Sequence, residues 1–250
     1  MDAETSGVRE VASGVYLLER AHVNCYLVAS EGSLVLVDAG LPRTWPLLRS
    51  ALRAIGAGPA DIDAIVLTHG HFDHVGMCDR LWTEFHRPVR VTEEDRELVR
   101  HPYRYAHENI RWGYPFRYPR SIPVLAGMVG AGAIGIKGVD ARGDIRPGDE
   151  IIGGLVAVPS AGHTAGHCGF LLEKSGVLFA GDALVTLDPY TGQTGPQIVA
   201  GAATADSGRA LAGLDAYAAT GARLVLPGHG APFDGGIDLA VRAAREVGAH

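Results

Sequence analysis

The chain has 250 residues, of which 47% are hydrophobic and 20% are charged. This composition is typical of a folded globular protein, and it excludes an intrinsically disordered or collagen-like chain. The formal net charge is -6. Such a charge argues against a protein whose whole surface meets nucleic acid, so we do not expect nucleic acid as a partner.

Cysteine usage and the N-terminal residues bear on the compartment. Cys25, Cys78 and Cys168 are too few and too widely spaced for a disulfide framework, which favours a reducing environment. The first ten residues, MDAETSGVRE, are polar, and the sequence has no run of about 18 apolar residues. The sequence therefore predicts a cytoplasmic protein without a membrane partner.

Short β-rich runs dominate the first third of the chain. Residues 15–18, 25–28 and 34–37 are typical of adjacent antiparallel strands, with a turn at 30–33. Residues 45–55 have helical spacing, and residues 62–67 indicate a buried strand. That strand runs into the loop sequence THGHFDH, and a strand that delivers several histidines to a loop is typical of a functional site.

The last third repeats this arrangement. Apolar runs at 155–158, 176–180 and 223–226 predict strands, and residues 205–219 predict a helix. His163, Asp182 and His229 follow these runs, each directly after a glycine that allows a tight turn. Strands and helices in this order predict an α/β fold with two sheets covered by helices on their outer faces.

Residues 92–140 differ from both flanks, and we expect a single domain over 1–250 with an insertion here. Thr92 and the acidic residues after it resemble a capping box, an aromatic run follows from 103 to 118, and residues 126–138 are rich in Gly and Ala. We expect aromatic side chains such as Trp112 and Phe116 to cover the site and contact an apolar or acyl-bearing small molecule. The alternative is that they pack against the domain or form a homodimer interface.

The insertion also carries positive charge. Residues 98–120 contain five arginines and one glutamate, so a carboxylate or phosphate of a substrate could bind there.

Four groups able to bind metals lie within six residues: His69, His71, Asp73 and His74. Alternate residues of an extended segment point the same way, so one loop can serve two neighbouring ions. Zn²⁺ binds neutral imidazole and carboxylate, and His163, Asp182 and His229 are candidates for the remaining ligands. Residue types alone do not fix the metal: zinc is our default, and iron or manganese is compatible with the same donors.

Together these motifs resemble the metallo-β-lactamase fold superfamily, in particular its glyoxalase II-like and lactonase-like dinuclear hydrolases, over about residues 14–230. The resemblance implies a four-layer αββα sandwich with two divalent metal ions. It assigns one ion to His69, His71 and His163, the other to Asp73, His74 and His229, and the bridging role to Asp182. It also places Asp38, at the end of LVLVDAG, beside the ligands as an outer-shell carboxylate.

The resemblance further implies a reaction. Two ions that share a water lower its pKa, and the resulting hydroxide attacks the carbonyl of an ester, lactone or thioester. Asp73 and Asp182 are the expected catalytic carboxylates, and Asp73 is a candidate for proton transfer. Tyr190 could reach over the substrate as a tyrosine does in lactonase-like relatives, but its spacing from Asp182 is long and favours an ordinary loop tyrosine.

The remaining histidines are not expected to bind metal. His167 lies four residues after His163 and is interpreted as a hydrogen-bonded core residue. The others lack the position after a strand that the cluster shares; they are His22, His86, His101, His107 and His250.

Three other classes of function remain open. A nuclease or phosphodiesterase of the same fold suits the basic insertion, but the chain lacks the extra domain typical of those relatives. An iron-dependent oxygenase-like relative would not need the complete second ligand set, and 250 residues leave no room for the flavin domain of the diiron type. A non-enzymatic binding module would require that no metal binds.

Overall fold

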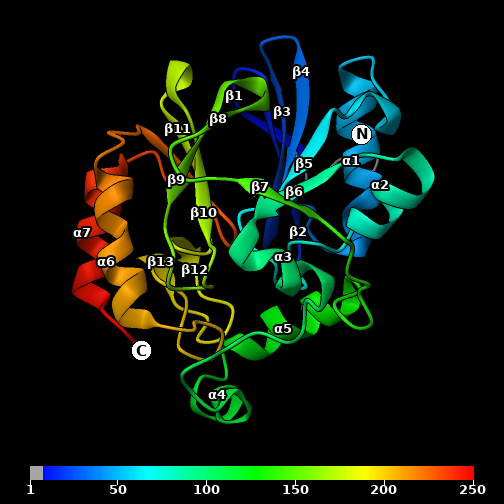
Figure 1. Ribbon diagram of the computed structural model, residues 1–250. Helices are drawn as coiled ribbons and strands as arrows, with labels where there is room; N and C mark the ends of the chain where they lie inside the picture. The colour runs from blue at the N-terminus through cyan, green and yellow to red at the C-terminus, as the bar shows by residue number, and fades with distance from the viewer. Residues whose placement is uncertain (1–7) are drawn as a thin grey trace.

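Two β-sheets lie face to face in the computed structural model, which describes residues 8–250 (Figure 1). The first sheet has the strand order β1-β2-β3-β4-β5-β6-β7, antiparallel from β1 to β4 and parallel from β4 to β7. Its strands are β1 (Val8–Ala12), β2 (Val15–Arg20), β3 (Val23–Ser30), β4 (Ser33–Val37), β5 (Ala64–Val66), β6 (Val89–Thr92) and β7 (Arg142–Ile145).

The second sheet has the order β14-β11-β10-β9-β8, and a separate hairpin pairs β12 with β13. The strands are β8 (Glu150–Ile151), β9 (Leu155–Pro159), β10 (Cys168–Leu172), β11 (Val177–Gly181), β12 (Val185–Leu187), β13 (Thr194–Gln197) and β14 (Leu224–Pro227). The expected strands are confirmed with small shifts at their ends; the run at 62–67, for example, forms a strand only over Ala64–Val66.

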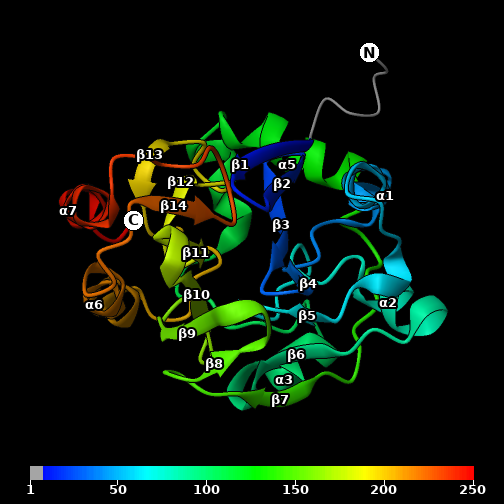
Figure 2. The ribbon, with the colours of Figure 1, turned by 90° about the horizontal axis from the view of Figure 1, so that it is seen from above.

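Helices cover the outer faces of both sheets (Figures 1 and 2). The helices α1 and α2 lie against the first sheet, and α6 and α7 lie against the second. The helices are α1 (Trp45–Ala54), α2 (Cys78–Phe85), α3 (Glu93–Arg100), α4 (Tyr114–Arg117), α5 (Ser121–Gly130), α6 (Ser207–Ala218) and α7 (Ile237–Val247). This is the expected four-layer αββα sandwich.

The alternation of side chains along each strand explains the layers. In β3, Tyr26 and Val28 point into the core between the sheets, whereas Leu27 points into the core beneath α1. In β10, Phe170 lies between the sheets and Leu171 faces α6 and α7. Because both faces of the central strands are buried, these strands are apolar throughout, which is why the sequence shows short continuous runs.

The segment from 92 to 140 contains α3, α4 and α5, between β6 and β7. Helix α3 packs beside β7, and α4 projects at the bottom of the view in Figure 1. The capping box expected at the start of α3 does not form. The Thr92 hydroxyl instead donates a hydrogen bond of 2.7 Å to the carbonyl of Gly166, in the loop that leads into β10.

Two further features complete the fold. The three cysteines are free and buried. Within residues 8–250, none of the helices is both long enough and apolar enough to cross a bilayer.

Asn24 links the two sheets near the end of β14. Its amide donates to the carbonyls of Pro227 (3.0 Å) and Gly230 (2.7 Å), on either side of His229. The hydroxyl of Tyr26 donates to the same Pro227 carbonyl at 2.7 Å. The first sheet therefore holds the loop that carries His229 in place.

We predict that Asn24→Ala destabilises the metal-free protein by about 1–3 kcal/mol, because the Gly230 carbonyl loses its donor and the Pro227 carbonyl keeps only that from Tyr26. Thr83→Ala, in the exposed face of α2, should change stability by less than about 0.5 kcal/mol. Urea unfolding measures both, with an unchanged slope and a shifted midpoint for Asn24→Ala. Equal midpoints for the two variants would contradict this role of Asn24.

Candidate metal centre

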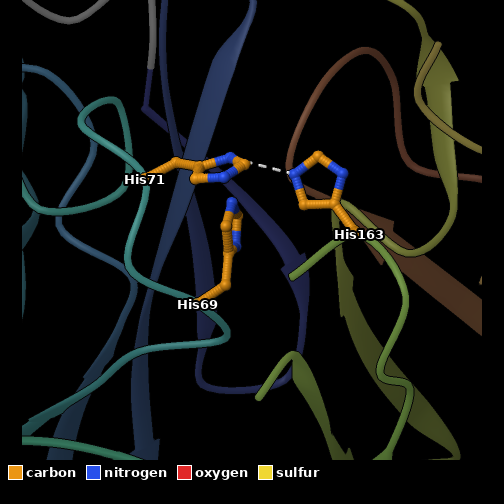
Figure 3. Close-up of side chains that lie close together, drawn as sticks. All are labelled: His69, His71 and His163. Atoms are coloured by element: carbon orange, nitrogen blue, oxygen red, sulfur yellow. Dashed lines mark hydrogen bonds between the residues drawn. The ribbon is translucent and has the colours of Figure 1, made fainter. Parts of the chain in front are cut away.

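The seven side chains singled out as metal ligands meet at one end of the sandwich, and each is at most 5% exposed. The first sheet supplies four of them from the loop after β5, and the second sheet supplies one after each of β9, β11 and β14. Figure 3 shows His69 and His71 from the first of these loops facing His163 from the second sheet. The residues are His69, His71, Asp73, His74, His163, Asp182 and His229.

Their ligand atoms form three overlapping groups, each with all its atoms within 4.8 Å of one another. One is His69, His71 and His163, which we call site one; another is Asp73, His74 and His229, which we call site two. The third group is His69, His74 and Asp182. It shares one residue with each of the other two, so the groups form a continuous pair of neighbouring sites.

Asp182 lies at the centre of the cluster. One of its carboxylate oxygens, Oδ2, is 3.2 Å from Nε2 of His229, 3.5 Å from Nε2 of His163 and 3.8 Å from Nε2 of His69. The other, Oδ1, is 3.4 Å from Nε2 of His74. A carboxylate between histidines of both sites is placed as a bridging ligand would be.

The pKa values of the clustered side chains depend on burial and on one another. Burial raises the pKa of Asp182, but His229 and His74 outweigh this effect and hold it well below its usual range. Burial opposes a charge on His229, but Asp182 outweighs it and raises the pKa of His229 to about 10. Burial lowers the pKa of His163 to about 4, so that imidazole is neutral at pH 7, the form that binds metals.

Most of the ligand imidazoles are oriented by a hydrogen bond from Nδ1. Nδ1 of His74 donates to Asp38 Oδ2 at 3.0 Å, and Nδ1 of His229 donates to the carbonyl of His22 at 3.0 Å. Asp38 therefore lies beside the candidate ligands, as the sequence predicted, and orients one of them. In the neutral imidazole, the form that a metal takes, these bonds fix the tautomer and direct the lone pair of Nε2 toward the cluster.

Two threonines orient the imidazoles of His69 and His163 in the same way. The Thr68 hydroxyl donates to Asp38 at 2.9 Å, so its oxygen accepts from Nδ1 of His69 at 3.0 Å. The Thr204 hydroxyl donates to the carbonyl of Val199 at 2.7 Å and likewise accepts from Nδ1 of His163 at 3.1 Å.

Several buried polar atoms in the cluster lack a hydrogen-bond partner among the described residues. They are Nε2 of His69, His71 and His74 and Oδ1 of Asp182. Buried polar groups normally find partners, because an unpartnered one costs about 1–3 kcal/mol. Imidazole nitrogens and carboxylate oxygens at this spacing are the donors that divalent transition metals take, so the residues fit such ions.

His167 lies where the sequence predicted a hydrogen-bonded core residue. His167 bonds Ser160 Oγ through Nδ1 at 2.7 Å and accepts from the backbone N–H of Asp182 at 3.0 Å, as a hydrogen-bonded core residue. His22 contributes only its carbonyl among the contacts described above.

A small cavity borders the cluster, with a free volume of about 10 Å³. This is roughly the space of one water molecule. Tyr190, which the sequence left as a possible substrate contact while its spacing favoured an ordinary loop residue, lines this cavity. Its hydroxyl bonds that of Tyr105 at 3.1 Å. The Tyr105 ring lies 4.1 Å from the ring of His71. Tyr105 was not singled out from the aromatic run, where no spacing signal separates it from its neighbours.

The expectation that Trp112 and Phe116 cover the site is corrected by the structure. Their side chains are 82% and 89% exposed, and neither is among the residues that line the cavity. They lie in and beside the short helix α4, which projects from the body of the molecule. Tyr105, near the start of the same segment, takes the position that was assigned to them.

Tyr105 also lines a larger cavity of about 400 Å³. It is lined by α3 and by the loops around His163 and Ala106, and most of its surface is apolar. Because Tyr105 and His163 border it, this cavity adjoins site one.

Comparisons with known proteins agree with this geometry. The family model of the metallo-beta-lactamase superfamily matches residues 18–229. The uncharacterized protein YobT of Bacillus subtilis is 34% identical over 163 residues, which are 64% of this chain and 61% of YobT. The probable metallo-hydrolase YflN of B. subtilis is 30% identical over 187 residues, 72% of this chain and 67% of YflN.

The N-acyl homoserine lactonase AttM of Azorhizobium caulinodans is 29% identical over 196 residues, 74% of this chain and 66% of AttM. The chain thus spans between 61% and 67% of the length of these three relatives.

Solved structures show the same fold. The metallo-beta-lactamase family protein TTHA1429 of Thermus thermophilus superposes with a TM-score of 0.65 at 25% identity, over 95% of this chain and 79% of that one. TTHA1623, solved in a di-iron-bound form, gives a TM-score of 0.63 at 25% identity, over 91% of this chain and 96% of that one. The match of the family model over most of the chain shows that this protein belongs to the metallo-beta-lactamase superfamily.

Proposed function

We propose that this protein is a dinuclear metal-dependent hydrolase that cleaves an ester, lactone or thioester of a small acyl-bearing molecule. The observation that carries the proposal is the convergence of five histidines and two aspartates, with unpartnered buried nitrogens facing a common centre. Membership of a superfamily that includes metallo-hydrolases supports the hydrolase class. The lactonase activity in the name of AttM supports a lactone among the candidate bonds.

Site one and site two would each hold a divalent ion, with Asp182 between them. When bound, such ions supply Lewis-acid chemistry: they make water a nucleophile at neutral pH and polarise a carbonyl. Zinc is our default and iron is an alternative, since a structural neighbour was solved with two irons.

The carboxylates of the chain contribute charge and proton transfer. Asp182 stays ionised because its neighbours hold its pKa low, so it offers negative charge to both sites. Asp73 borders the small cavity with Oδ2 3.3 Å from Nε2 of His229. A water or leaving group in that cavity would lie within reach of Asp73, which is the position a proton acceptor needs.

Tyr105 and Tyr190 also line this small cavity. Burial raises the pKa of both phenols, so both keep their protons at neutral pH. Their mutual hydrogen bond uses one hydroxyl hydrogen and leaves the other free. The pair can therefore donate to an oxygen of the substrate that develops negative charge.

The cavity of about 400 Å³ beside Tyr105 suits the acyl arm of the substrate. Its volume lies within the usual range for small-molecule sites, and most of its exposed surface is apolar, although Glu94, Glu97 and Arg104 also line it. It opens next to His163, so an acyl chain lying in it would place the scissile carbonyl near site one.

Metal content and substrate class can be tested together. We predict two ions per chain after reconstitution with Zn²⁺, and hydrolysis of at least one member of a panel of esters, lactones and thioesters. Removal of metal with a chelator should abolish turnover, and returned metal should restore it. His71→Ala and Asp182→Ala should bind less metal and lose turnover, while the far-ultraviolet circular dichroism stays close to that of wild type.

One ion or none per chain would contradict the dinuclear assignment. Two ions without turnover of any acyl substrate, but with turnover of a phosphodiester, would move the protein to the nuclease class.

The role of Tyr190 predicts a loss in kcat. Tyr190→Phe removes the hydroxyl and should lower kcat on the order of 100-fold, as the loss of one oxyanion donor does. Tyr118→Phe makes the same change where the hydroxyl accepts from Arg117, and kcat should stay at the wild-type value. An unchanged kcat in Tyr190→Phe would leave this tyrosine as a packing residue.

The acyl cavity predicts a change in chain-length preference. Ala106→Phe fills part of it and should lower kcat/KM for long acyl esters far more than for acetyl esters, because burial of a chain is worth about 25 cal/mol per Å². Trp112→Ala, on the projecting segment, should leave the ratio of the two kcat/KM values unchanged. If instead Trp112→Ala changes the ratio and Ala106→Phe does not, the acyl chain lies against α4.

A further inference from the structure

Asp95 is a buried carboxylate to which the reaction above assigns no step, although it also lines the cavity of about 400 Å³. It lies in the first turn of α3 and is 1% exposed. Its Oδ1 accepts from the backbone N–H of Gly166 at 2.7 Å. Its Oδ2 accepts from the backbone N–H of Gly70 at 3.0 Å and from the hydroxyl of Thr164 at 2.7 Å.

The positions of these three donors relate Asp95 to site one. Gly70 stands between His69 and His71 in the loop after β5. Thr164 directly follows His163 in the loop after β9. These two loops belong to different sheets, and together they carry all three imidazoles of site one. The carboxylate of Asp95 therefore joins these two loops. The loops must keep a fixed separation if the three imidazoles are to bind one ion.

The close packing of α3 against both loops requires glycine at two positions. A Cβ at Gly70 would lie 2.7 Å from the backbone nitrogen of Val99, in α3. A Cβ at Gly166 would lie 2.8 Å from the backbone nitrogen of Asp95. Contacts under 3.0 Å are essentially never made by real Cβ atoms. Glycine at both positions lets the helix come close enough for its carboxylate to reach the loops.

Burying this carboxylate is costly, since an ionised group loses its hydration. Among residues 8–250 no ion pair to Asp95 is present, so the three hydrogen bonds and the N-terminal end of the α3 dipole are what offset the cost. A neutral side chain would join the loops at lower cost but with weaker bonds, because bonds to an ionised acceptor are about twice as strong.

Site two depends on other groups. Its ligand His74 is oriented by Asp38, and its ligand His229 is oriented by the carbonyl of His22. The loop of His229 is held by Asn24. Asp95 contacts none of these three groups. Of the two loops that it joins, the His163 loop carries no ligand of site two, so we expect the effect of Asp95 to be confined to site one.

We propose that Asp95 is a positioning residue that sets the separation of the His69–His71 loop from the His163 loop and thereby the metal affinity of site one. The inference rests on the proposed function only in that the cluster binds metal. Outer-shell partners of metal ligands typically change metal affinity 10- to 100-fold.

The test measures Zn²⁺ affinity by competition with a chromophoric chelator in two backgrounds. His229→Ala removes a ligand of site two and leaves site one complete, whereas His163→Ala removes a ligand of site one and leaves site two complete. Asp95→Asn keeps the shape of the side chain but turns an amide N–H₂ toward one of the donors. It should weaken Zn²⁺ binding 10- to 100-fold in the His229→Ala background and leave it unchanged in the His163→Ala background.

Asp188→Asn provides the matched control. Asp188 is equally buried and accepts from the backbone N–H of Tyr190 at 3.0 Å and from the hydroxyl of Thr191 at 2.8 Å, outside the ligand loops of site one. Its loss should lower stability without changing Zn²⁺ affinity in the His229→Ala background. If Asp95→Asn does not fold, Thr164→Val removes a single donor and should give a smaller loss with the same selectivity.

Each possible result either supports or overturns the proposed role of Asp95. Equal losses in both backgrounds, or none, overturn the role of Asp95 while leaving the metal centre intact. A wild-type protein that binds no Zn²⁺ overturns the proposed function, and this inference with it. A loss confined to the His229→Ala background supports Asp95 as a residue of site one.

Discussion

The carboxylate of Asp182, within 3.8 Å of four imidazoles, is the interaction on which the rest of the site depends. These groups come from two sheets, so their meeting requires that the sheets keep a fixed separation and register. The apolar core between the sheets provides this, with Phe170, Phe179 and Tyr26 among its buried side chains. A close-packed interior deforms little, and strand ends fixed to it hold their loops within the tolerance that metal coordination needs.

Much of this could be predicted from the sequence, because the signals are local. The run HGHFDH places four candidate ligands on one loop, and the glycines before His163, Asp182 and His229 mark strand ends. The same reasoning could not find Asp95, since its role depends on contacts with Gly70 and Thr164 that are 25 and 69 residues away. A first-turn acidic residue in a helix is common, and only the tertiary structure distinguishes this one from Glu93 and Glu94.

In the aromatic segment, the sequence indicated a role but assigned it to the wrong residues. Composition indicated that aromatic residues cover the site, but it could not say which ones. Tyr105 lies five residues beyond the end of α3, and the length of that connection brings its ring against His71. Trp112 and Phe116 follow after a further turn and point to solvent. Distance along the chain from a fixed element, and not residue type, decides which side chain reaches the cavity.

The turn between β2 and β3 contains backbone strain that is linked to the site. Ala21 and His22 have φ values of 55° and 64°, in the left-handed region that favours glycine. Strain of this kind costs about 1–3 kcal/mol per residue and persists only where the surroundings over-determine it. Here the His22 carbonyl accepts from His229, and two residues later Asn24 holds the same loop. A glycine would adopt this turn without strain, but it would also widen the range of carbonyl directions. The bulkier residues, held by those bonds, keep the carbonyl of His22 directed at His229.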